Sequence, residues 1–301
     1  MHGLLLIDKP AGVTSHDVVQ KIRRICATRK VGHAGTLDPL ATGVLVVAVG
    51  DATKILQFLF TDEKSYRAVF KLGETTDTYD AQGTVLLRRP LPLLDEGTLE
   101  TACQSFRGEI SQLPPMYSAL KSNGVPLYRL ARQGKEIARE PRQIRITRLQ
   151  VIAVAPPEVT IEVDCSKGTY IRSLVHDLGE QLGCGAHLTA LRRLRSGRFG
   201  IDQCYSLAAL AALPDPATAL LGLGEALADY PVVRPDQDAL AALSFGIPPL
   251  QERCLSETPL ADGDLVRLQD AERMVAVARY RPRRENEKRG DFELIRVFPE
   301  V

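Results

Sequence analysis

The alternation of apolar and polar positions predicts a chain of mixed strands and helices. Apolar runs of strand length occupy residues 4–8 and 44–49, and residues 66–72 alternate with the period of two of a half-buried strand. Residues 15–27, after a Thr-Ser pair suited to an N-cap, and residues 170–182 repeat apolar side chains along one helix face. Both kinds of element therefore contribute to the core.

Further elements follow the same pattern along the chain. Residues 52–60 and 99–106 predict short helices, and residues 144–154 and 159–164 predict a strand pair around a proline turn. Residues 187–194 return to strand character. Hairpins mixed with helices predict the α+β class, with a mixed and mostly antiparallel sheet, rather than a doubly wound parallel sheet.

Two regions depart from this regular pattern. Residues 108–134 contain Pro-Pro, Val-Pro and Ser-Asn-Gly breaks, which predict an irregular excursion from the core. After residue 230, short strands are expected at residues 260–268, 274–280 and 294–299. The polar stretch 281–291 is expected to form a long or disordered hairpin loop. The C-terminal part thus reads as a small β domain.

Composition narrows the class of protein. At 301 residues, with 45% hydrophobic and 25% charged residues, the chain suits a globular protein with one large and one smaller domain. No apolar run approaches the ~18 residues of a membrane span, and the first ten residues lack the basic start of a signal peptide. The six cysteines are scattered without a C-x-x-C pair. We expect a cytoplasmic protein with reduced thiols, no metal and no membrane contact.

The net charge of +1 conceals segregated charges. Residues 121–148 hold eight basic and two acidic residues, residues 201–270 hold three basic and eleven acidic ones, and residues 279–289 are basic again. Local charge decides where a phosphate backbone can bind. The first basic run is interleaved with apolar residues and Tyr128, as in a helix that presents arginines on one side. RNA contact is one interpretation of this run, and a solvated face is the other.

Residues 30–43 concentrate the candidate chemistry. Three glycines, His33, Asp38 and Pro39 precede the strand expected at residues 44–49. Glycine and proline permit a tight turn, which can hold one carboxylate at the rim of a sheet as a nucleophile or base. The alternative is a structural turn in which Asp38 bonds its own backbone.

These residues and several further blocks in sequence order resemble the bacterial tRNA pseudouridine synthases of the TruB family. The blocks cover about two thirds of the chain and are more specific together than a lone glycine pattern. They are residues 3–18, residues 32–43 with 51–54, residues 65–68, residues 76–80, residues 114–119 and residues 165–172.

The resemblance implies the isomerisation of uridine to pseudouridine at position 55 in the T-loop of tRNA. Asp38 matches the nucleophile of the family, and Arg172 matches the arginine that pairs with it. Tyr66 matches the residue that stacks on the target base and helps to remove the proton from its carbon 5. The reaction neither oxidises nor hydrolyses its substrate, so no cofactor is expected.

The resemblance also implies a substrate-binding set. His33 corresponds to the histidine that fills the space left by the flipped-out uridine, because an enzyme must expose this base before reaction. Tyr170 and Leu191 match positions that line the uracil pocket. Asp80 is expected to orient its neighbours, and Lys54 to hold a phosphate.

The implied architecture has two parts. Residues 1–229 are expected to form the catalytic domain, with an RNA-contacting excursion at about residues 108–148. Residues 230–301 are similar to the PUA-like β-barrel that binds RNA. The expected partner is the T-arm of tRNA, bound by a monomer without a guide RNA. The alternatives are the catalytic subunit of a guide-RNA-directed pseudouridine synthase and a non-catalytic tRNA-binding or tRNA-folding protein.

Overall fold

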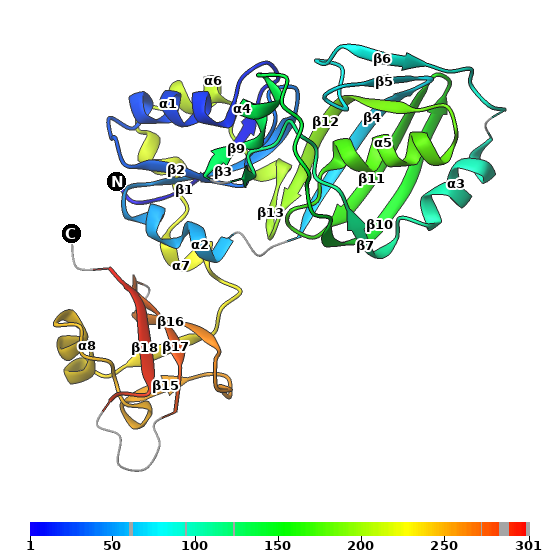
Figure 1. Ribbon diagram of the computed structural model, residues 1–301. Helices are drawn as coiled ribbons and strands as arrows, with labels where there is room; N and C mark the ends of the chain where they lie inside the picture. The colour runs from blue at the N-terminus through cyan, green and yellow to red at the C-terminus, as the bar shows by residue number, and fades with distance from the viewer. Residues whose placement is uncertain (60–62, 94, 123, 272, 283–288, 299–301) are drawn as a thin grey trace.

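Two separate β-sheets organise the chain (Figure 1). The structure is a computed structural model that describes residues 1–59, 63–93, 95–122, 124–271, 273–282 and 289–298. Within these residues, nine strands form the larger sheet, and five C-terminal strands form the smaller one. Most strand pairs are antiparallel, so the predicted α+β class with a mostly antiparallel sheet is confirmed.

The main sheet has the strand order β1-β3-β12-β4-β11-β10-β7, and β2 and β13 pair at its side with β3 and β12. Only β3 and β12 run parallel within this order. The strands are β1 Gly3–Lys9, β2 Val31–Ala34, β3 Thr42–Val49, β4 Lys64–Leu72, β7 Gly108–Gln112, β10 Arg142–Ala155, β11 Glu158–Cys165, β12 Ala186–Ser196 and β13 Phe199–Gly200. The order places β4, which carries Tyr66, in the centre of the sheet.

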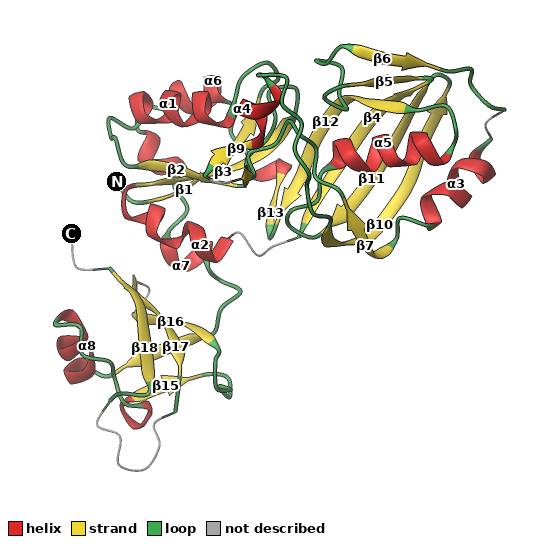
Figure 2. Cartoon of the chain, in the orientation of Figure 1, coloured by secondary structure: helices red, strands yellow, loops and turns green. Residues whose placement is uncertain are grey.

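Helices cover the sheet and connect its strands (Figure 2). They are α1 Ser15–Ile25, α2 Leu56–Leu59, α3 Glu96–Gln104, α4 Leu127–Ala131, α5 Ile171–Gln181, α6 Leu207–Ala211, α7 Leu223–Ala226 and α8 Gln237–Ser244. The 3₁₀-helices are η1 Gly50–Ile55, η2 Ile201–Gln203, η3 Pro216–Ala219 and η4 Gln251–Arg253. The start of α1 is a capping box, in which the Thr14 side chain accepts from the Asp17 backbone N–H and Asp17 accepts from Thr14.

The helices α1 and α5 pack their apolar faces on the sheet. Leu174, Val175 and Leu178 of α5 are fully buried in one core with residues of β4, β11 and β12. Val18 and Ile22 of α1 are fully buried in a second core with residues of β1 and β3. Because each helix is bound along its length, its N-terminal turn has a defined place at the edge of the sheet.

The smaller sheet has the order β15-β14-β16-β17-β18. Its strands are β14 Val232–Pro235, β15 Cys254–Ser256, β16 Leu265–Asp270, β17 Arg273–Tyr280 and β18 Phe292–Val297. It has a core of its own and a contact with the rest of the chain. At that contact the Tyr230 hydroxyl donates to the Phe58 carbonyl at 3.1 Å, and the Arg267 guanidinium donates to the Tyr230 carbonyl at 2.9 Å.

Two-stranded ribbons complete the fold. β5 Glu74–Thr76 pairs with β6 Val85–Arg88, and β8 Lys121–Ser122 pairs with β9 Val125–Pro126. The turn between β5 and β6 carries Asp80, and the second ribbon lies in the predicted excursion.

Most expected elements are present, three expectations need correction, and a fourth falls mostly outside the described residues. Residues 31–34 are a strand rather than a loop, because they pair with the second half of β3. The helix expected at residues 52–60 is a 3₁₀-helix followed by the single turn α2, and residue 60 lies outside the described residues. The excursion begins later than residue 108, because residues 108–112 form the edge strand β7 against β10. Most of the loop expected at 281–291, residues 283–288, lies outside the described residues.

Candidate active site

A cavity of about 690 Å³ opens where the N-terminal turns of α1 and α5 approach the β2–β3 loop and the centre of the sheet. Its volume is in the usual range of ligand sites. Four cationic side chains line it, against two carboxylates. The cations are Lys64, Arg132, Arg172 and Arg193, and the carboxylates are Asp38 and Asp80. The cavity therefore suits an anionic ligand.

Asp38 and Arg172 form a two-point ion pair in this cavity. The Arg172 Nε donates to Asp38 Oδ2 at 2.9 Å, and Nη2 donates to Oδ1 at 3.1 Å. The Asp38 side chain is 36% exposed, whereas that of Arg172 is 5% exposed. A planar guanidinium and a carboxylate match in this geometry, so the pair fixes the plane of the carboxylate while leaving it open to the cavity.

Local contacts determine the path of the Asp38 loop. The Ser15 hydroxyl donates to the Leu37 carbonyl and accepts from the Leu37 N–H, which ties the loop to the start of α1. Gly43 follows with φ +99°, and a Cβ there would lie 2.1 Å from the Arg193 carbonyl oxygen. Only glycine permits this approach, so Gly43 allows β3 to pair with β12 next to the Asp38 carboxylate.

The buried Arg172 side chain also donates hydrogen bonds to two segments that are distant in the sequence. Nη1 donates to the Thr78 carbonyl at 3.0 Å, and Nη2 donates to the Tyr117 carbonyl at 2.8 Å. Asp80 Oδ2 lies 3.6 Å from Nε. These partners compensate the desolvation of the guanidinium, and they join the β5–β6 turn and the excursion to the site.

Tyr66 and Leu191 lie on the central strands β4 and β12 and line the same cavity. Both residues are buried. Burial raises the pKa of the Tyr66 phenol, and the neighbouring Arg193 guanidinium counteracts part of that effect. At neutral pH the Tyr66 phenol is therefore protonated. The two side chains provide an apolar surface next to the Asp38 carboxylate.

His33 lies in β2 opposite Val47, at the cavity and not on a loop as the sequence suggested. Burial lowers the pKa of the imidazole, and the charges of Arg193 and His16 lower it further. Its Nδ1 atom is buried and has no hydrogen-bond partner in the described part of the chain. His33 is therefore a neutral ring at the wall of the cavity.

Tyr170 and Asp80 frame the opposite side. Tyr170 is the N-cap residue of α5, where its N–H donates to Gln112 Oε1 at 2.8 Å and its carbonyl accepts from Gln112 Nε2 at 3.0 Å. The Asp80 carboxylate accepts from the Thr78 hydroxyl at 2.7 Å and the Gln82 N–H at 3.0 Å. Both side chains line the cavity.

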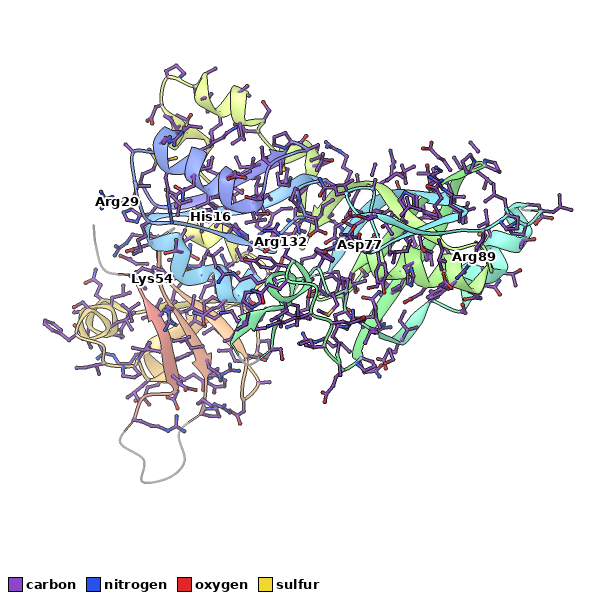
Figure 3. The ribbon with its side chains drawn as sticks, turned by 45° about the horizontal axis from the view of Figure 1, so that its top comes forward. His16, Arg29, Lys54, Asp77, Arg89 and Arg132 are labelled. Atoms are coloured by element: carbon purple, nitrogen blue, oxygen red, sulfur yellow. The ribbon has the colours of Figure 1, made fainter. Side chains whose placement is uncertain are left out.

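Lys54 is the one predicted site residue that the structure places outside the cavity lining. Its ammonium group lies 3.4 Å from the Asp51 carboxylate and 5.7 Å from the centre of the Phe298 ring. Figure 3 labels it beside the C-terminal sheet, away from His16 and Arg132, which line the cavity. It is at the junction of the two sheets.

Several site residues were not identified from the sequence. Arg193 is fully buried and donates to the carbonyls of Val44 and Gly35 at 2.6 and 3.0 Å. Lys9 is also fully buried, and its ammonium group donates to three carbonyls, including that of Pro39 next to Asp38. Tyr117 lies in a block that the sequence singled out. Its contact is a backbone carbonyl, which no side-chain pattern indicates.

No group of three or more His, Cys, Asp or Glu residues in the described ranges could hold a metal ion. No helix among those residues is long and apolar enough to cross a membrane.

Two family models match the chain. The N-terminal domain of the TruB family pseudouridylate synthases matches residues 23–171, and the tRNA pseudouridylate synthase B C-terminal domain matches residues 172–219. The tRNA pseudouridine synthase B of Syntrophotalea carbinolica is 51% identical over 300 residues, 99% of this chain and 98% of that protein. The protein of the same name from Geotalea uraniireducens is 45% identical, covering 93% and 92%.

Solved structures share the fold over almost the whole chain. A chain of an H/ACA ribonucleoprotein bound to a substrate RNA containing 2'-deoxyuridine has a TM-score of 0.75 and 26% identity. A chain of a Cbf5-Nop10-Gar1 complex has a TM-score of 0.75 and 29% identity. Each alignment covers 99% of this chain and 85% of the other.

Proposed function

The chain belongs to the TruB family of pseudouridylate synthases, and from this premise we propose that it converts uridine 55 in the T-loop of tRNA into pseudouridine without a guide RNA. The observation that carries this proposal is the Asp38–Arg172 pair, which presents one carboxylate to a cavity that also holds Tyr66 and Leu191. A uracil base can lie between the carboxylate and this apolar surface.

The reaction exchanges one bond for another. The bond between uracil N1 and ribose C1' breaks, a bond between C5 and C1' forms, a proton leaves C5, and N1 gains a proton. A carboxylate can begin this exchange by attacking the sugar or the base, or by removing a sugar proton. Asp38 is the carboxylate with the required exposure, and Arg172 holds it oriented in the cavity. We expect Asp38 to begin this bond exchange without a cofactor.

Tyr66 is the proposed stacking partner of the uracil. Because burial keeps its phenol protonated, Tyr66 gives its own proton to solvent water as it takes the proton from C5, and N1 takes its proton from water. Leu191 and Tyr170 complete the apolar walls of the pocket, and Asp80 holds the turn that supports Arg172. These roles are expected to be separable by substitution, because they act at different stages of turnover.

Base flipping explains the presence of His33 at the cavity. A uridine inside a folded loop must leave its stack, which costs a few kcal/mol, and a ring that replaces it lowers this cost. His33 is neutral and half-buried, and its Nδ1 has no partner in the described residues, so insertion into an RNA stack requires no loss of an existing bond at that atom.

The RNA contacts are proposed to extend beyond the cavity. The T-arm would lie against the basic residues of the excursion and of the adjoining strand β10, of which Arg129, Arg142 and Arg145 are exposed. The C-terminal sheet would act as a PUA-like RNA-binding domain at residues 230–301, next to a catalytic domain at residues 1–229. Lys54, at the junction, is placed to contact RNA that spans both parts. We propose a monomer that acts in the cytoplasm.

Two alternatives make different demands on the protein. A guide-directed catalytic subunit would require a guide RNA for activity. The curated relatives named tRNA pseudouridine synthase B are more similar to this chain than the Cbf5-containing structures are, which supports action on tRNA alone. A non-catalytic tRNA-binding or tRNA-folding protein would not need Asp38. The position of the exposed Asp38 carboxylate in the cavity therefore supports the enzyme.

One experiment tests the proposal. Purified wild type and Asp38→Asn are incubated with an unmodified T-arm stem-loop, and pseudouridine is mapped at nucleotide resolution. Conversion of one T-loop uridine by the wild type alone is the expected result. Binding without conversion by the wild type, or conversion by both proteins, would contradict it.

A further inference from the structure

Tyr79 lies between two residues that contact Arg172. The Thr78 carbonyl accepts from Arg172 Nη1 at 3.0 Å, and the Asp80 carboxylate lies 3.6 Å from Arg172 Nε. Tyr79 itself has φ +62°, in the left-handed region that a bulky side chain rarely adopts. Such a conformation persists only where the surroundings stabilise it, so the contacts of this turn must offset its cost.

One of these contacts is with His176. The two rings are stacked, with centroids 3.9 Å apart and an angle of 8° between their planes. His176 is the fourth residue after Arg172 on α5, so the two side chains lie on the same face of this helix. The stack therefore attaches the turn carrying Thr78 and Asp80 to the helix that carries Arg172.

The imidazole contributes packing rather than a hydrogen bond at its inner nitrogen. His176 Nδ1 is buried and has no hydrogen-bond partner in the residues that the structure describes. Burial also lowers the pKa of His176, which keeps the ring neutral. A neutral ring with an unsatisfied buried atom is costly to retain. The imidazole therefore contributes its flat face, which stacks on the Tyr79 ring.

The turn has backbone support that does not depend on the stack. The Tyr79 carbonyl accepts from the Leu188 N–H at 3.0 Å, and the Ala81 N–H donates to the Leu188 carbonyl at 2.8 Å. The Thr76 hydroxyl donates to the Asp80 carbonyl at 2.8 Å. Removal of the Tyr79 ring should therefore leave the turn on β12 and release only its attachment to α5.

We infer that Tyr79 and His176 are a pair of positioning residues, which hold the Thr78 carbonyl and the Asp80 carboxylate on Arg172 and thereby orient the Asp38 carboxylate. This inference rests on the proposed function, because the consequence of misorientation is a slower reaction. Neither residue lines the cavity. The pair acts on the site through Arg172.

Two substitutions at residue 79 separate the ring from the backbone. Tyr79→Gly relaxes the left-handed backbone and removes the stack, whereas Tyr79→Phe keeps the stack and removes the hydroxyl. Single-turnover rates at saturating T-arm RNA, RNA affinity and melting temperature are measured for each. We expect the rate for Tyr79→Gly to fall about 10- to 100-fold, as for a small misplacement of a reacting group. We expect Tyr79→Phe to keep the wild-type rate, and both variants to bind RNA as the wild type does.

The helix side provides an independent test. His176→Ala should reproduce the rate loss of Tyr79→Gly, and His176→Phe should restore the rate, because a flat ring returns. If Tyr79→Gly unfolds, the His176 variants decide the question. Ala27→Gly is the matched control, since Ala27 also has a positive φ, of 47°, but lies after α1 outside the cavity.

Three results would overturn the inference. They are an unchanged rate for both Tyr79→Gly and His176→Ala, a loss confined to RNA affinity, and a failure of His176→Phe to exceed His176→Ala. A failure of the proposed function is distinguishable, because the wild type would then form no pseudouridine at all.

Discussion

The side chains of Asp38 and Arg172, which are 134 positions apart in the chain, meet in a two-point ion pair at 2.9 and 3.1 Å. Arg172 makes this contact from the first turn of α5, whose apolar face is buried against the centre of the main sheet. Asp38 makes it from a loop that Ser15 attaches to α1. The orientation of one carboxylate thus depends on two helices and the sheet between them.

Arg172→Lys is predicted to reduce turnover while RNA affinity stays nearly unchanged. Lysine keeps the positive charge but cannot bond both carboxylate oxygens or reach the Thr78 and Tyr117 carbonyls in one plane. A loss of about 100-fold in the single-turnover rate is expected. Arg192→Lys is the control, because Arg192 forms a similar two-point pair with Asp8 that does not line the cavity. An equal loss in both variants would argue against a special role of Arg172.

Three exposed arginines in the basic run at residues 121–148 are predicted to contribute to RNA binding and not to the chemical step. Replacing Arg129, Arg142 and Arg145 together by alanine should weaken T-arm binding and lower the slope of log affinity against log salt by up to about one unit per lost phosphate contact. The rate at saturating RNA should not change. The triple lysine variant, which keeps the charges, should preserve the slope. A salt dependence unaffected by the alanine variant would place the RNA elsewhere.

Asp177→Asn is predicted to stabilise the protein above pH 6 and to have no effect below pH 4. Burial, with the charge of Glu180, raises the pKa of the Asp177 carboxyl to about 6. The unfolded chain loses this proton near the ordinary carboxyl pKa of 3.8, so the native state binds more protons between these pH values, and stability falls as pH rises through the window.

Asparagine is neutral at every pH and avoids this loss. The gain at pH 7 is expected to be about 1 kcal/mol, less than the full pKa displacement implies, because solvent reaches part of the carboxyl group. Urea unfolding of both proteins at pH 4, 5, 6 and 7 measures it. A difference in the free energy of unfolding that does not vary with pH would exclude this cause.

Gly43→Ala is predicted to destabilise the protein strongly. The added Cβ would lie 2.1 Å from the Arg193 carbonyl oxygen, at a residue whose φ is +99°. A loss of roughly 3 kcal/mol is expected from strain and displaced backbone. Gly12→Ala separates the strain of a positive φ from the clash of an added Cβ. Gly12 also has a positive φ, but no neighbour lies within 4 Å of an added Cβ. Similar losses in both variants would mean that the approach of β12 is not the reason for the glycine.

The sequence predicted those features that neighbouring residues encode. The apolar periods of α1 and α5 and the alternation in β4 are local, so their positions could be predicted within a few residues. The resemblance to the TruB family implied that Asp38 and Arg172 form a pair. It also placed Tyr66, Tyr170 and Leu191 at one pocket, and all three line the cavity.

Lys54 shows the limit of this reasoning. Its place in a matched block suggested a phosphate contact, and only the structure shows that its neighbours are Asp51 and Phe298, at the junction of the two sheets. Position along the chain cannot indicate which face of a short 3₁₀-helix turns toward a second sheet, because that depends on how the two parts pack.

The sequence by itself determined the fold class, the family and the residue types of the site. Only the tertiary structure decided which groups surround Arg172, because two of its acceptors are backbone carbonyls that every residue possesses. The burial of Arg193 and Lys9, and the Tyr79–His176 stack, likewise follow from how the sheet brings distant segments together. Local patterns record the period of a helix or strand. Contacts between segments that are distant in the sequence are determined by the packing of those elements on one another.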